Sequence, residues 1–178
     1  MAETAVVGLS PSLEREEAFA RLVSRELASA YRTATVLLRD SAEAEDATQD
    51  ALVRAWQGWD ALRDEGRAGA WFGRILVNVC RDRLRARRPT TVRLRDPGSS
   101  ADPSAPIGER GALEDAFARL TVEQRIVVAL RFYLDLPTEA IAERTGVPPG
   151  TVKSRLHHAL RALRAAYEAE ERAIEVER

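Results

Sequence analysis

The sequence lacks the residues that several common kinds of site require. Its single cysteine, Cys80, excludes an internal disulfide and a zinc site built on a cysteine cluster, and we expect it in or beside a helix core. It contains no glycine-rich phosphate loop, no zinc-ligand spacing and no nucleophile elbow. No apolar run is long enough to span a membrane, and the N-terminus does not combine a basic start with an apolar core, as a secretory signal does. We therefore expect a cytoplasmic protein that is not an enzyme, inserts in no membrane, and binds no metal or cofactor.

The overall amino-acid composition is typical of a soluble globular protein. Of the 178 residues, 45% are hydrophobic and 31% are charged, which suffices for one ordinary domain or two small ones. The net charge of −1 argues against a uniformly basic surface, but the charges are segregated along the chain. Of the 27 basic residues, Lys153 is the one lysine, and arginine suits bidentate contacts to phosphate and guanine.

The segment 138–164 is typical of a helix, a tight turn and a second helix. Gly146 stands where the turn needs a residue that tolerates a positive φ. Pro148 and Pro149 prevent the first helix from continuing, and Thr151 is the better N-cap candidate for the second helix. This pattern predicts a helix-turn-helix.

The second helix of this unit has one apolar face and one cationic face. At 100° per residue, six apolar side chains fall together: Val152, Leu156, Ala159, Leu160, Leu163 and Tyr167. Lys153 and Arg155 flank the opposite face, which holds Ser154, His157, His158, Arg161 and Arg164. Residues 150–166 contain no acid. A helix-turn-helix presents such a face to the DNA major groove; the alternative is a solvated amphipathic helix in a bundle.

A strong helix is predicted for residues 70–87. Its buried stripe consists of Phe72, Ile75, Leu76 and Val79. Its opposite face is one continuous row: Arg74, Asn78, Arg81, Arg85 and Arg88. Trp59 and Trp71 flank the charged, glycine-containing loop before it. Arginines neutralise phosphates and aromatic rings stack on unpaired bases, so this face favours nucleic-acid binding; the alternative is a solvated basic helix.

Residues 40–50 hold five acids and no base: Asp40, Glu43, Glu45, Asp46 and Asp50. Ser41 can cap a helix here, and acids are favoured in the first turns of a helix. Two further interpretations stay open, a metal or acid–base site and an acidic face that docks a basic partner.

The remaining signals divide the chain into two helical domains. Ser10 and Pro11 predict a helix start, and another helix is expected from about residue 30 to 39. Residues 89–110 hold four of the eight prolines and predict a flexible proline-rich linker. Beyond the linker, Thr121 and Gln124 have capping-box spacing. We therefore expect an all-α fold with domains at 10–88 and 111–170.

Three long segments together resemble the extracytoplasmic-function (ECF) sigma factors, the small two-domain members of the sigma-70 superfamily. They are AEAEDATQDALVRAW (42–56), AWFGRILVNVCRDRLRARR (70–88) and LTVEQRIVVALRFYLDLPTEAIAERTGVPPGTVKSRLHHALRALR (120–164), and they occur in the family's order. The resemblance implies that the first domain is sigma region 2, a helical bundle, and the second is region 4. It also implies a subunit that binds core RNA polymerase and directs promoter-specific initiation of transcription.

The resemblance further implies three sets of site residues. The acidic helix would dock on RNA polymerase through Asp46, Gln49, Asp50 and Arg54. The helix at 71–88 and the loop before it would recognise and open the minus-ten promoter element through Trp71, Arg74, Asn78, Arg81 and Asp82. Region 4 would read the minus-thirty-five element through Thr151, Lys153, Ser154, Arg155, His157 and His158. The implied partners are the β′ and β subunits of core polymerase, promoter DNA, and an anti-sigma factor that masks these faces.

Two positions depart from the family pattern. Gly73 stands where the family often has an aromatic or larger residue, so one minus-ten contact is expected to be missing. His158 stands where arginine is common, and a shorter, mostly neutral side chain predicts weaker or differently specific contacts. The alternative function is a stand-alone helix-turn-helix regulator. Such a regulator needs a dimer interface, but no heptad seam supplies one, so we expect no obligate homo-oligomer.

Overall fold

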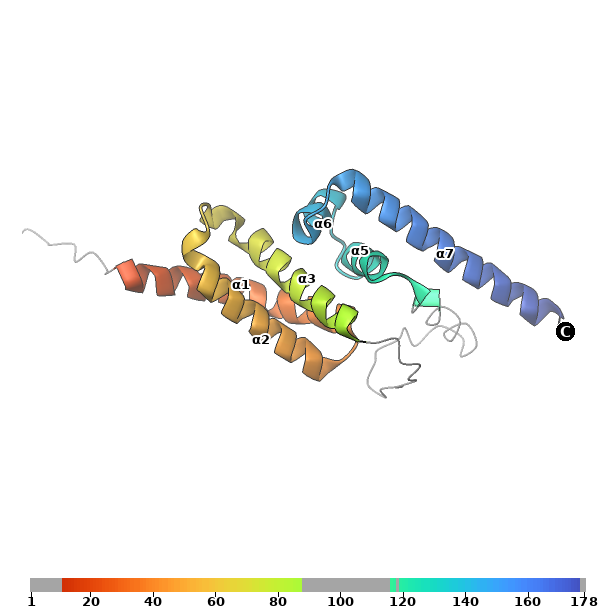
Figure 1. The fold of residues 1–178 in the computed structure, drawn as a ribbon, viewed down its shortest axis with the longest axis horizontal. Coiled ribbons are helices and arrows are strands. Elements are labelled where there is room, and N and C mark those ends of the chain that lie inside the picture. Colours follow the sequence, from red (N-terminus) through yellow and green to blue (C-terminus); the bar gives the residue numbers. More distant parts are fainter. Residues whose placement is uncertain (1–10, 88–115, 118, 177–178) are drawn as a thin grey trace, which may run out of the picture.

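Among the residues that the structure describes, the order of helices is a long helical hairpin, a third helix, and then a second group of three helices (Figure 1). This computed structural model describes residues 11–87, 116–117 and 119–176. Within those ranges the regular elements are all helices, as predicted. The predicted linker, 89–110, lies outside the described residues, as do Ser10 and Arg88. None of the described helices has the length and apolarity needed to cross a bilayer.

The first helix, α1 (Pro11–Leu38), is continuous where the sequence predicted two helices. The expected second start near Ala30 is wrong, because no glycine or proline interrupts residues 12–38. Leu22, Ala34 and Leu38 are buried along one stripe. Tyr31 is 40% exposed, because it lies outside that stripe.

Helix α2 (Ser41–Gly58) packs on its neighbours through a stripe of alanines. Ala44, Ala47, Ala51 and Ala55 are fully buried, and their small side chains suit a close approach of helix axes. The predicted cap was wrong by one residue. Asp40 has an extended backbone and its Oδ1 accepts a hydrogen bond of 2.9 Å from the Glu43 amide, so Ser41 is already inside the helix.

Two short 3₁₀ turns, η1 (Trp59–Ala61) and η2 (Glu65–Arg67), connect α2 to α3 (Ala68–Ala86). The predicted stripe of α3 is confirmed for Phe72, Leu76 and Val79, which are at most 2% exposed; Ile75 is half-buried. Cys80 is buried in the same helix, as predicted. Together α1, α2 and α3 form the bundle in red to green in Figure 1.

The second group contains α5 (Val122–Phe132), α6 (Thr138–Thr145) and α7 (Pro149–Val176). The capping box is confirmed: the Gln124 amide donates to Thr121 Oγ1 at 3.2 Å, and the Thr121 amide donates to Gln124 Oε1 at 2.9 Å. Gly146 caps α6 with φ 71°, as the turn required. Thr151 is not the N-cap, because α7 already begins at Pro149 and the Thr151 amide bonds to Pro148 O at 2.9 Å.

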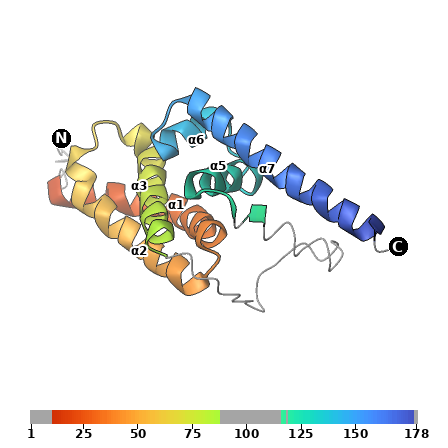
Figure 2. The same ribbon diagram turned by 45° about the vertical axis from the view of Figure 1, so that its right-hand side comes forward.

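The two helical groups lie against each other, with α3 facing α5 and α6 (Figure 2). One continuous hydrophobic core contains Phe72 and Leu76 from α3 together with Ile126, Val127 and Ile141 from α5 and α6. The far half of α7 extends away from this core toward the C-terminus in both views. The packing therefore places the basic face of α3 beside the helix-turn-helix.

Candidate nucleic-acid and polymerase interfaces

The start of α7 presents most of the predicted cationic face to solvent. Lys153, Ser154, His157 and His158 are exposed, and Thr151 is half-buried. Val152 and Ala159 on the opposite side are fully buried, and they anchor the helix against α5 and α6. Leu160 and Tyr167 were expected on the packed face but are more than 40% exposed, whereas Leu163 between them packs against a small cluster with Ala159. The exposed cationic turns directly follow a tight glycine turn, which is the geometry of a helix-turn-helix.

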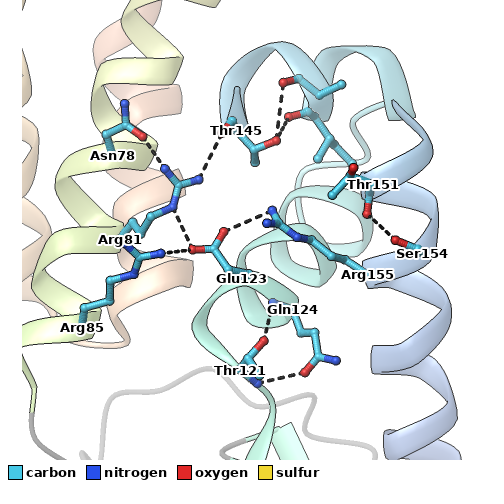
Figure 3. Close-up of polar contacts among 12 residues, drawn as sticks. Asn78, Arg81, Arg85, Thr121, Glu123, Gln124, Thr145, Thr151, Ser154 and Arg155 are labelled. Carbon is cyan, nitrogen blue, oxygen red and sulfur yellow. Dashed lines mark hydrogen bonds and ion pairs between the residues drawn. The ribbon is translucent and has the colours of Figure 1, made fainter. Parts of the chain in front are cut away.

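Arg155 differs from its neighbours on α7. Its side chain is 25% exposed, and its Nη1 lies 3.1 Å from Glu123 Oε2 at the start of α5 (Figure 3). The guanidinium therefore points toward α5 and α3 and away from the surface that carries Lys153.

The predicted basic face of α3 divides into an exposed part and a covered part. Arg74 and Asp82 are exposed, whereas the Arg81 side chain is 13% exposed. Arg81 donates from Nη2 to Thr145 O at 3.2 Å and from Nη1 to Asn78 Oδ1. Residues of α5 and α6 therefore cover the middle of this face.

Glu123 is a residue that the sequence analysis did not identify. Its Oε1 accepts a hydrogen bond from Arg85 Nη2 at 2.7 Å and lies 3.2 Å from Arg81 Nε, while its Oε2 contacts Arg155 (Figure 3). In the sequence it is one acid in the first turn of a helix, where an acid has an ordinary electrostatic reason. No local pattern indicates that three arginines from two other helices converge on it.

Trp71 lines a groove of about 260 Å³ at the start of α3. The other lining residues are Leu62, Arg63, Asp64, Arg67, Ala70, Arg74 and Glu143. The Trp71 ring packs against Trp59, with ring centroids 6.2 Å apart and planes at 67°. An ion pair between Arg67 and Glu143 of α6 spans this end of the interface. The groove thus combines an aromatic ring with cations, but one of its walls belongs to α6.

The acidic helix α2 exposes all four of its predicted docking residues: Asp46, Gln49, Asp50 and Arg54. Arg83 of α3 donates to Asp50 Oδ2 at 2.6 Å, and this hydrogen bond raises the pKa of Arg83. Arg87 lies 2.5 Å from Glu43 Oε2. The basic end of α3 therefore neutralises part of the acidic surface and leaves Asp46 outward.

The described side chains bear on a metal site at residues 40–50 and on the chemistry of Cys80. In the described part of the chain, no three potential metal ligands gather at one point, so the metal interpretation of residues 40–50 has no support. Burial raises the pKa of the Cys80 thiol to about 12, so it stays protonated at neutral pH.

Family models match both halves of the chain. The model described as "Sigma-70 region 2" matches residues 22–90, and the model "Sigma-70, region 4" matches residues 110–163. The "ECF RNA polymerase sigma factor SigL" of Mycobacterium tuberculosis is 38% identical over 150 residues, covering 80% of this chain and 85% of that protein. The "RNA polymerase sigma-E factor" of Streptomyces avermitilis is 37% identical over 140 residues, covering 78% of each.

Two solved structures share the fold. CnrH, solved in complex with the cytosolic domain of CnrY, gives a TM-score of 0.62 at 23% identity, covering 88% of this chain and 96% of that chain. The sigma factor RpoE of Bartonella quintana, solved with the anti-sigma factor NepR, gives a TM-score of 0.55 at 22% identity with the same coverage.

Proposed function

This chain belongs to the ECF family of sigma-70 RNA polymerase sigma factors, and on that premise we propose which of its surfaces carry each step of promoter-specific transcription initiation. Three surfaces are candidates: the cationic start of α7, the basic face of α3 with the groove at Trp71, and the acidic face of α2. Each has the charge that its target requires, because DNA phosphates attract the first two and a basic polymerase surface attracts the third.

The start of α7 binds the minus-thirty-five element in the major groove. Its exposed donors are Lys153, Ser154, His157 and His158, and Thr151 lies beside them near the helix N-terminus, where a phosphate is favoured. Arg155 joins this set when its contact with Glu123 is exchanged for DNA. His158 brings a shorter donor to the groove than an arginine would, so we expect weaker or differently specific contacts at this position.

The α3 face and the groove at Trp71 bind the minus-ten element. Arg74 is exposed for phosphate contact, and Trp71 supplies an aromatic wall where an unstacked base can lie. Asn78, Arg81 and Asp82 continue the same face of α3. Opening of the duplex is favoured when unpaired bases find such a surface.

Helix α2 docks on core polymerase. Asp46, Gln49, Asp50 and Arg54 are exposed on one helix, which is what a docking face for the β′ subunit requires, and region 4 contacts the β subunit. The protein acts with polymerase in the cytoplasm, without catalysis of its own and without obligate dimerisation. A regulator of the anti-sigma class masks these faces, as the NepR complex of RpoE suggests by analogy.

The observation that carries this proposal is the acid-free, exposed start of α7 directly after the glycine turn. Run-off transcription tests it, with core bacterial RNA polymerase and genomic promoter fragments, with and without the protein. New start sites that share elements near minus ten and minus thirty-five are expected. Lys153→Ala should weaken initiation and reduce the salt slope of promoter binding by about 1.

Arg172→Ala is the matched control, because it removes the same charge from an exposed position of the same helix, about five turns away. If no transcript appears and the protein does not co-elute with core polymerase, the assignment is wrong. Protection of a palindromic DNA site without polymerase would instead favour the stand-alone regulator.

A further inference from the structure

The indole of Trp71 lies over a position of α2 that has no side chain. A Cβ added at Gly58 would lie 3.3 Å from Cζ2 and 3.9 Å from Cη2 of Trp71, and both of these atoms belong to the six-membered ring of the indole. Gly58 is the last residue of α2, and Trp71 lies in the first turn of α3. The ring therefore fills the space that the missing side chain of Gly58 leaves.

The backbone conformation at Gly58 does not itself require glycine. Its φ of −93° and ψ of 2° lie in a region that other residues also adopt, and alanine is the better residue in a helix. Within the part of the chain that the structure describes, the atoms that an added Cβ would meet both belong to Trp71. The close approach of the indole is thus the physical reason for a glycine at this position.

Trp59, the next residue, supports the same indole. It is 7% exposed, and its ring centroid lies 6.2 Å from that of Trp71 with the planes at 67°, an edge-to-face contact. Trp59 makes a second edge-to-face contact with Phe19 of α1, at 5.3 Å and 88°. Trp71 is therefore the last of three packed rings, and it is the one that lines the groove.

A ring with a fixed orientation is a better platform for a base than a mobile one. Stacking on an aromatic side chain stabilises an unpaired base, and a ring that already has its bound orientation loses less conformational freedom when the base arrives. A displaced or rotating indole would forfeit part of that stabilisation.

We propose that Gly58 and Trp59 are positioning residues for promoter opening. They hold the Trp71 indole in the orientation in which an unpaired base of the minus-ten element stacks on it. Both act through Trp71 and need no contact with DNA of their own. The proposal rests on the assignment of Trp71 to the minus-ten element made above.

The first measurement is made on the free full-length chain. With tryptophan labelled by nitrogen-15, each of the three tryptophans gives one indole N–H signal in a nuclear magnetic resonance spectrum, and Trp56→Phe and Trp59→Phe assign the signals. Gly58→Ala adds only a Cβ and should shift the Trp71 signal more than the Trp56 signal, because the added atom meets the Trp71 ring.

The second measurement follows opening of a promoter found by run-off transcription, with core polymerase at saturation. Permanganate modification of unpaired thymines gives the equilibrium constant between closed and open complexes. Trp71→Ala should lower this constant by about 5- to 150-fold, the range expected when one base loses its aromatic partner. Gly58→Val should lower it by about 3-fold or more, because the branched side chain displaces the ring and removes part of the stacking. Affinity for core polymerase should be unchanged in both variants.

The control is Ala20→Val, which places the same side chain at an exposed position of α1 that has no proposed contact. It should leave both the Trp71 signal and promoter opening as in wild type.

A double-mutant cycle separates positioning from a general loss of structure. Because Gly58 acts through the ring, Gly58→Val should have no further effect on opening in the Trp71→Ala chain, whereas a fold defect would add to it. Trp59→Phe keeps an aromatic ring beside Trp71 and should retain most of the opening that Trp59→Leu loses. If Gly58→Val lowers the helical content in circular dichroism, Gly58→Ala takes its place in the cycle.

The proposal is overturned if Gly58→Ala leaves the Trp71 signal in place, if Gly58→Val opens the promoter as wild type does, or if its effect persists in the Trp71→Ala chain. In these cases a Trp71→Ala chain that opens the promoter poorly still supports the proposed function. If Trp71→Ala opens the promoter as wild type does, the assignment of Trp71 to the minus-ten element is wrong, and the positioning role is overturned with it.

Discussion

Two glycines on either side of the helix-turn-helix turn should respond to alanine with opposite signs. Gly146 caps α6 at φ 71° and ψ 28°, in the left-handed region. Gly150 is the second residue of α7, has no positive φ, and has no atom within 4 Å of the place where a Cβ would lie. The same chemical change therefore meets strain at the first position and open space at the second.

The magnitudes follow from these conformations. A Cβ in the left-handed region costs about 1–2 kcal/mol, and the entropy that alanine removes from the unfolded chain returns about 0.4–1 kcal/mol. Gly146→Ala should therefore destabilise the protein by about 1 kcal/mol. Gly150→Ala should stabilise it by about 0.5 kcal/mol, because alanine is the better helix former.

Thermal unfolding followed by circular dichroism measures both changes. For a chain of this size the two variants should differ in Tm by roughly 3–6 °C, with wild type between them. A Cβ at position 146 also approaches Arg74, so the cycle with Arg74→Ala separates the two costs. Equal shifts for both glycines would refute the reasoning from backbone conformation, and so would a stabilising Gly146→Ala.

Three further predictions concern stability and reactivity. Phe72→Ala should lower the free energy of unfolding by about 3–5 kcal/mol in urea titrations, because the ring is 1% exposed at the centre of the core; a loss below about 1 kcal/mol would contradict that burial. Thr121→Ala should lower the free energy of unfolding by about 1 kcal/mol, since it removes the hydrogen bond that the Gln124 amide donates to Thr121 Oγ1. Thr121→Ser should retain most of the stability, because serine keeps the hydroxyl acceptor. Cys80, with its pKa raised from 9.0 to about 12, should carry about 1000-fold less thiolate at pH 8 than in the unfolded chain. A thiol reagent should therefore modify Cys80 at least that much more slowly in buffer than in guanidinium chloride, and equal rates would contradict the burial. Because the folded chain binds this proton more tightly, its contribution to stability is complete below about pH 9 and is lost as pH rises toward 12.

Local signals in the sequence were sufficient where the chain needs only its near neighbours. The turn at Gly146, the capping box of Thr121 and Gln124, and the buried stripe of α3 each depend on residues within a few positions, and the structure confirms them. The error at the start of α2 is also local, because it concerns two adjacent residues. Asp40 and Ser41 are both good caps, and the choice between them depends on a backbone angle that composition does not express.

The sequence by itself determined the helices, their apolar stripes and the segregation of basic and acidic faces, because helical periodicity and capping are local. The tertiary structure alone decided which charged faces remain free. Lys153 and Arg155 are two residues apart and carry the same charge, yet the first faces solvent and the second contacts Glu123. That difference depends on α3, α5 and α7 coming together from distant parts of the chain, since a carboxylate binds whichever arginines the packing brings within about 3 Å of it.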